Sequence, residues 1–280
     1  MAENTNNTPK FVEEEPVNYN TAVSAGILHS ADKNDDQVLF LYSRLMNLPF
    51  SKIETISLIE KSLYAELSKN PDDTLALIAL MQTQTALGNH EKAKALAYKI
   101  WEVGNKLLKE EDYVYVNNLL NIGLLEMASA LLKPRFENLS SQIEFYYPML
   151  LKLSTMTGSS QLIERLATHP NAPEKDDLFL KIISRYKSYN YTDHFKNVQK
   201  IILETVKGRL CVYDYDILGP VMEEIEVTLY LTGDTIELQN TREELEEKLA
   251  DYYKSANIEK LSSFSWRIKS VSSHPAMGFD

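Results

Sequence analysis

The stretch TLALIALMQTQTALGNHEKAKALAYKIWEVG, residues 74–104, contains two helix-forming runs separated by a glycine. Apolar residues recur in both runs at helical spacing, and Gly88 can take the positive φ at which many helices end. The second run carries Ala93, whose small side chain lets two helices of a hairpin approach closely. The stretch therefore predicts a helix–turn–helix unit that buries its apolar faces against neighbouring units.

Two further glycines, Gly123 and Gly158, follow Gly88 at intervals of 35 residues. Each lies where one apolar helical segment ends and another begins, and Ala128 follows Gly123 as Ala93 follows Gly88. A fixed period of this length is typical of stacked helical hairpins. We expect the best repeats over residues 51–170 and less regular helical hairpins over 176–261.

Local signals refine this expectation. Ser51 with Glu54, and Thr241 with Glu244, have the spacing of capping boxes that open helices, and Asp73 is expected to cap the helix that follows it. Apolar residues from 217 to 231 are interpreted as another helix.

The pattern Pro71, Leu80, Gly88 and Ala93 resembles that of tetratricopeptide repeats, although Met81, Ala97 and Ile163 stand where the family has other residues. The resemblance covers roughly residues 38–170. It implies an all-α protein, a right-handed superhelical stack of antiparallel helix hairpins, with an inner groove lined by the first helix of each hairpin. Carried onto this chain, the groove positions that would bind a partner are Ile78, Gln82, Tyr113, Asn117 and Lys152.

The two ends of the chain differ from its middle. Residues 1–35 are polar and are expected to be disordered or to form an arm that orders on a partner, whereas residues 36–261 form the helical domain. The last segment, 262–280, is expected to be an extended tail that folds back on the helices, or else a docking motif. For docking, the candidate residues are Trp266, Arg267 and Phe279.

Charge and composition limit the partners. The net charge is −11, and residues 223–251 alone carry ten acidic side chains against Arg242 and Lys248. This stretch is either a solvated helix face or a dock for a basic protein, and it disfavours nucleic acid. No apolar run reaches the length of a membrane span, so no membrane partner is expected. A single cysteine and no visible signal peptide predict a cytoplasmic protein.

Signatures of catalysis are not found. The chain has no glycine-rich phosphate loop and no HExxH motif, and its five histidines lack metal-ligand spacing. His90 lies in the Gly88 turn, where an exposed polar residue is expected. Cys211 lies between Leu210 and Val212, which predicts a buried, inert thiol. We therefore expect no catalytic residues, no metal and no cofactor.

The leading functional hypothesis is a non-catalytic scaffold or adaptor that binds another protein through its helical-repeat surface. The expected partner is a peptide or helix in the groove, or a basic protein at residues 223–251. Formation of a homo-oligomer is a further alternative. The alternative is a structural subunit of a larger assembly, such as a virion or a secretion apparatus. An RNA-binding helical-repeat protein and an enzyme with an unrecognised site are weaker alternatives.

Overall fold

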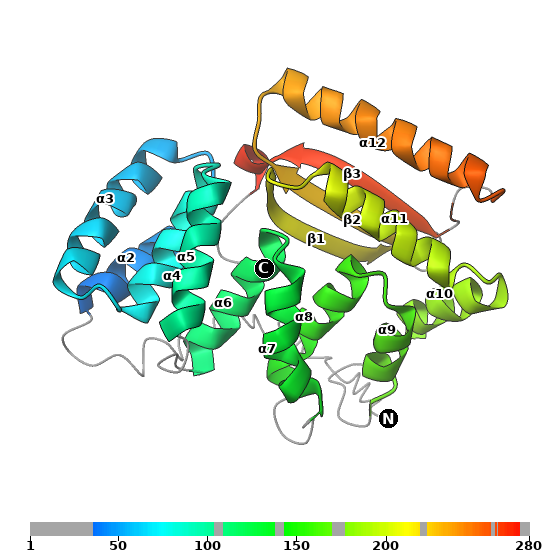
Figure 1. The fold of residues 1–280 in the computed structure, drawn as a ribbon, viewed down its shortest axis with the longest axis horizontal. Coiled ribbons are helices and arrows are strands. Elements are labelled where there is room, and N and C mark those ends of the chain that lie inside the picture. Colours follow the sequence, from blue (N-terminus) through cyan, green and yellow to red (C-terminus); the bar gives the residue numbers. More distant parts are fainter. Residues whose placement is uncertain are drawn as a thin grey trace, which may run out of the picture.

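In the computed structural model, a row of helices is followed by a small β-sheet and a long helix that runs alongside it (Figure 1). The structure describes residues 36–103, 109–137, 143–169, 177–218, 223–258, 261 and 263–274. The helices of the row are α2 (Asp36–Met46), α3 (Ile53–Lys69), α4 (Thr74–Ala86), α5 (His90–Val103), α6 (Lys109–Asn121), α7 (Leu125–Glu137), α8 (Ile143–Met156), α9 (Ser160–Ala167), α10 (Asp177–Ser188) and α11 (Thr192–Thr205). We call residues 36–205 the helical array.

The turns of the array confirm the role predicted for the three spaced glycines. Gly88, Gly123 and Gly158 have φ angles of +76°, +76° and +64°. In each turn the residue after the glycine donates its amide to a carbonyl five residues earlier, which satisfies a free group at the helix end. These bonds are all 2.8 Å long: Asn89 to Gln84, Leu124 to Leu119, and Ser159 to Ser154.

The 35-residue period corresponds to lateral stacking of the first helices of the hairpins, α4, α6 and α8. Lys152 on α8 donates to the Asn117 side chain on α6, 35 residues earlier, at 3.3 Å. Tyr146 donates to Asp112, 34 residues earlier, at 3.2 Å. Equivalent positions of successive hairpins therefore lie side by side.

The prediction of an all-α fold is wrong, because three strands follow the array: β1 (Leu210–Leu218), β2 (Glu224–Leu231) and β3 (Phe264–Ser270). Residues 217–231, interpreted from sequence as a helix, contain the end of β1 and all of β2. In β2 the buried residues Ile225, Val227 and Leu229 alternate with half-buried ones, which is the period of a strand with one covered face. The helical interpretation counted apolar residues without testing for this alternation.

The sheet has the strand order β1-β2-β3, with β1 and β2 antiparallel and β2 and β3 parallel. Parallel neighbours need a crossover, which here is the helix α12 (Thr235–Ser255). We call residues 210–274 the sheet module. It ends in the short helix η2 (Val271–Ser273), directly after β3.

Two predicted capping boxes are wrong. The helix α12 begins six residues before Thr241, and its box joins Asp234 to Glu237 instead. Thr241 lies inside the helix, where its hydroxyl donates to the Glu237 carbonyl at 2.8 Å. The helix α3 begins at Ile53 and has no side-chain cap. The predicted Asp73 cap is confirmed by its bond to the amide of Ala76 at 2.8 Å.

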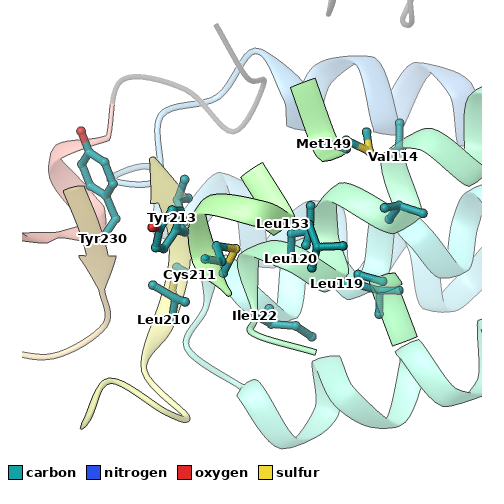
Figure 2. Close-up of a cluster of buried hydrophobic side chains, with 14 of the residues drawn as sticks. Val114, Leu119, Leu120, Ile122, Met149, Leu153, Leu210, Cys211, Tyr213 and Tyr230 are labelled. Carbon is teal, nitrogen blue, oxygen red and sulfur yellow. The ribbon is translucent and has the colours of Figure 1, made fainter. Parts of the chain in front are cut away.

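One hydrophobic core joins the array to the sheet module. Figure 2 shows Leu210, Cys211 and Tyr213 of β1 beside Leu119, Leu120 and Leu153 of the array. On the apolar face of the sheet, Phe195 of α11 packs edge-on against Phe264 of β3, with ring centroids 5.8 Å apart. The helix α12 packs against both α11 and β3, so it lies beside the third strand of the sheet (Figure 1).

Candidate functional site

The predicted groove positions lie in the interior of the molecule. Ile78, Gln82, Tyr113 and Asn117 expose 0%, 4%, 6% and 6% of their surface. Gln82 donates to the sulfur of Met46 in α2 at 3.3 Å, and β1 packs against α6. A peptide could reach these side chains only after neighbouring elements of the same chain had moved.

Lys152, the fifth groove position, belongs to a polar junction between α6, α8 and β1. Its ammonium group donates to Asn121 at 2.6 Å and to Asn117 at 3.3 Å. Burial lowers the pKa of Lys152 to about 8, although the charge of Asp214 opposes this shift. Two of the predicted residues, Asn117 and Lys152, are thus brought together, in a contact within the chain.

The carboxylate of Asp214 extends this junction to the end of the described chain. His274 lies 3.6 Å from it and is itself buried between Phe50 and Tyr230, with ring centroids at 5.4 Å and 4.7 Å. Burial alone would raise the pKa of Asp214, but the hydrogen bond from His274 and the charges of Lys152, His274 and Lys269 outweigh burial and lower it. The carboxylate therefore stays ionised at neutral pH, and its charge attracts the Lys152 ammonium group of the array.

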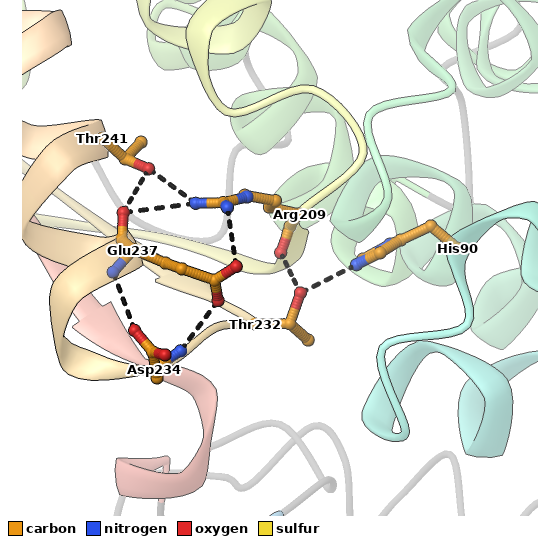
Figure 3. A network of polar contacts seen from close by, with 6 residues as sticks. All are labelled: His90, Arg209, Thr232, Asp234, Glu237 and Thr241. Carbon is orange, nitrogen blue, oxygen red and sulfur yellow. Dashed lines mark hydrogen bonds and ion pairs between the residues drawn. The ribbon is translucent and has the colours of Figure 1, made fainter.

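A second polar network joins the Gly88 turn to the start of α12 (Figure 3). His90 contacts the hydroxyl of Thr232 at 3.3 Å, and Arg209 donates to Thr241 at 2.8 Å and pairs with Glu237 at 3.4 Å. His90 is 7% exposed, so the expectation of an exposed turn residue is wrong. Its pKa is lowered, first by burial and then by Lys94, which favours a neutral ring.

Cys211 lies at this same contact and has the inert character predicted for it. Its sulfur is 3.4 Å from the Thr85 carbonyl and 4.0 Å from the His90 ring. Burial raises the pKa of the thiol to about 12, which removes the thiolate needed for nucleophilic attack. Across the described ranges, no three His, Cys, Asp or Glu side chains lie close enough together to hold a metal ion.

A hollow of about 470 Å³ opens between α12 and β3. Its lining includes Trp266 and Arg267, which were predicted from the sequence to belong to a tail. Both lie in the middle of the strand β3. Phe279, the third tail candidate, lies outside the described residues. The lining combines apolar and charged side chains: Arg242, Glu246, Leu249, Ala250, Tyr253, Ser265, Trp266 and Arg267. We call this the α12–β3 hollow.

The helix α12 carries several exposed carboxylates, and one of them, Glu246, lines the α12–β3 hollow. Of the acidic residues predicted as a dock, Glu226 pairs with Arg267, Glu223 with Arg185 and Glu244 with Lys248. Glu246, Glu247 and Asp251 are exposed and, within the described part of the chain, pair with no basic side chain. Of these three, Glu246 lines the hollow, whereas Glu247 and Asp251 project from other faces of α12.

Sequence reasoning missed the α12–β3 hollow because its two walls lie apart along the chain. Its α12 residues recur at positions 242, 246, 249, 250 and 253, which is one face of a helix. Only the crossover between β2 and β3 brings this face next to residues 265–267. A helical-wheel projection of 235–255 would have identified the half-apolar face but not its neighbour.

No helix in the part of the chain that the structure describes is both long and apolar enough to cross a membrane. Comparisons of the chain with models of protein families, with curated proteins and with solved structures find no match.

Proposed function

We propose that this chain is a non-catalytic protein-binding module that captures a basic segment of a partner protein at the α12–β3 hollow. One observation carries the proposal: the hollow of about 470 Å³ is lined by apolar side chains and by the carboxylate of Glu246, which pairs with no basic side chain within the described residues. A pocket that combines apolar side chains with a few charged ones is common at recognition sites.

The two parts of this surface have different tasks. Leu249, Tyr253 and Trp266 supply apolar area that an anchoring side chain of the partner can bury, which is where most binding energy arises. The carboxylates attract a basic segment over several ångströms and raise the rate of association. Together they favour a partner with one large apolar side chain flanked by Lys or Arg.

The polar groups elsewhere support this proposal over catalysis. Lys152 donates to Asn121, and Asp214 pairs with His274, so both side chains are engaged within the chain. The thiol of Cys211 is buried and its pKa is raised. Each therefore has a structural task between the array and the sheet module. The α12–β3 hollow, in contrast, has an open surface.

Selection of 12-residue peptides from a phage-displayed random library tests the proposal. We expect enriched peptides to carry an aromatic or long aliphatic residue with flanking Lys or Arg. The triple variant Glu246→Lys, Glu247→Lys and Asp251→Lys should weaken binding of the best peptide at least tenfold, because it reverses the charge of α12 at the hollow and around it. Fluorescence anisotropy in low and physiological salt measures this.

The matched control reverses three exposed acidic residues of the array, Glu54→Lys, Glu102→Lys and Glu126→Lys. It changes the net charge equally and should alter the affinity less than twofold at physiological salt, where distant charges are screened. Failure to enrich any peptide, or equal losses in both triple variants, would overturn the proposal.

A further inference from the structure

The charges that line the α12–β3 hollow are of both signs. Arg242 and Arg267 bring guanidinium groups to it, and Glu246 brings a carboxylate. The guanidinium of Arg267 already pairs with Glu226 of β2. Arg242, in contrast, pairs with no carboxylate among the described residues. A segment bound in the hollow therefore meets an unpaired cation as well as an unpaired anion.

Arg242 and Glu246 do not neutralise each other. They lie four residues apart on one face of α12, and both are exposed, but they form no ion pair in the structure. An arginine that precedes a glutamate by one helical turn is also the less favourable order for such a pair. Each charge is therefore available to a ligand.

The charged and apolar ends of the hollow are separated along α12. At a rise of about 1.5 Å per residue, Arg242 lies roughly 6 Å from Glu246 and roughly 10 Å from Leu249 along the helix axis. Leu249 and Tyr253 of α12, with Trp266 of β3, supply the apolar lining. One large residue has a comparable length when its side chain lies at the apolar end and a carboxylate on its main chain lies at the charged end.

We propose that the partner segment ends inside the α12–β3 hollow, so that its last residue is the anchor and its C-terminal carboxylate pairs with Arg242. The Lys or Arg residues that precede the anchor lie near Glu246. This inference rests on the proposed function and adds to it that the partner segment is a C-terminal tail. A guanidinium can hold a carboxylate through two parallel hydrogen bonds, and capture of a C-terminal carboxylate is an established mode of peptide recognition.

Charge favours a chain end over a basic segment that continues through the hollow. A continuous basic segment would place a Lys or Arg side chain against Arg242, and like charges repel. A terminal carboxylate supplies the negative group that Arg242 lacks and leaves the residues before it basic. The occupant is therefore a tail in which basic residues precede a large apolar last residue.

Two synthetic versions of the best selected peptide test this inference. Both end at the anchor residue, one with a free C-terminal carboxylate and the other with a C-terminal amide. The amide form is more positive by one charge, so attraction by the acidic residues of α12 alone would make it the tighter ligand. We expect instead that the carboxylate form binds the full-length protein at least fivefold more tightly, as measured by fluorescence anisotropy at physiological salt.

Substitutions in α12 identify the cation. Arg242→Gln should bring the affinities of the two peptides within twofold of each other, because it weakens binding of the carboxylate form alone. The affinity of the amide form should not fall, which shows that the variant is folded. The matched control, Lys248→Gln, removes the same charge from another exposed face of α12 and should keep the fivefold preference.

The outcomes separate this inference from the proposed function. Equal affinities of the two forms, or tighter binding of the amide, would overturn the inference while the charge-dependent binding of the longer selected peptide stands. Failure of both shortened peptides to bind would overturn it as well. A preference for the carboxylate that survives Arg242→Gln would contradict the role of Arg242. Loss of binding by every peptide, the longer one included, would instead overturn the proposed function.

Discussion

The helical array is held together by contacts between hairpins that follow one another in the sequence. The sheet module, in contrast, depends on contacts between residues that are separated by much of the chain. Hydrogen bonds between successive hairpins join residues about 35 positions apart, as between Lys152 and Asn117. The module is tied to the array by His90 and Thr232, which are 142 positions apart. A sequence period therefore describes the array but cannot describe the surface against which the sheet packs.

The three turn glycines make this contrast measurable. They share a positive φ, yet a Cβ atom added at each would meet different surroundings. At Gly123 nothing lies within 4 Å, whereas at Gly88 the nearest atom is the Thr232 methyl of the sheet module at 3.1 Å. At Gly158 the backbone of Lys196 in α11 lies at 2.5 Å. Local conformation is the same in all three, and tertiary packing is not.

The largest predicted effect is that of Gly158→Ala. We expect a loss of about 3–5 kcal/mol in the free energy of unfolding. The alanine would strain the positive φ, and its Cβ atom would also force backbone atoms of α11 to shift. Gly123→Ala should lose only about 1 kcal/mol, the cost of the positive φ alone. Gly88→Ala should fall between them, since a threonine methyl can yield more easily than a backbone. Urea unfolding measures all three.

Gly123→Ala is the internal control for this series, because it has the same φ as Gly88 and no neighbour. Equal losses for the three variants would mean that neither α11 nor the sheet module packs against these turns. That result would contradict the docking of α11 and the sheet module described above.

The second prediction concerns the polar junction at Lys152. Its pKa is lowered to about 8 from 10.5, so between these values the unfolded state binds more protons and stability rises with pH. Lys152→Met removes this titration. From pH 8 to 9.5, wild type should gain about 1–1.5 kcal/mol of unfolding free energy relative to the variant. Urea unfolding at several pH values provides the comparison.

Lys133→Met, which removes an exposed lysine from α7, is the matched control and should leave the pH dependence of wild type unchanged. If wild type and Lys152→Met instead had parallel stability profiles, Lys152 would be as solvated as a surface lysine. The junction between α8 and β1 would then be open in solution.

The smallest effects compare helix caps in the two parts. Asp73 caps α4 of the array and Asp234 caps α12 of the sheet module, each through a 2.8 Å bond to a backbone amide. Asp73→Ala and Asp234→Ala should each destabilise by about 1 kcal/mol. Ser51→Ala should change stability by less than about 0.3 kcal/mol, because Ser51 makes no cap bond to α3. A loss at Ser51 equal to that at Asp234 would restore the capping box that the sequence predicted there.

The sequence allowed correct predictions where a feature depends on neighbouring residues. The turn glycines, the Asp73 cap and the buried Cys211 follow from positive φ, local hydrogen bonding and apolar flanks. The strands could also have been predicted, since Ile225, Val227 and Leu229 alternate with more exposed residues. The expectation of continued hairpins favoured a helical interpretation there.

The residues of the candidate site were harder to predict than the turns and caps, because tertiary structure brings them together. The groove residues were chosen by likeness to a repeat, and the structure places Ile78, Gln82, Tyr113 and Asn117 in the interior. Trp266 and Arg267 do line the α12–β3 hollow, but as members of a strand. Nothing in the sequence of residues 265–267 indicates that α12 lies beside them, because only the crossover places that helix there.

From its residues alone this chain specified its helical hairpins, their 35-residue period, their turns and its acidic segment, since each arises from interactions within a few residues or from simple charge. The folded structure settled which surfaces are covered. The sheet module closed over the array because apolar side chains on both are buried only when the two meet. The same docking left the α12–β3 hollow accessible, and we propose that the partner binds there.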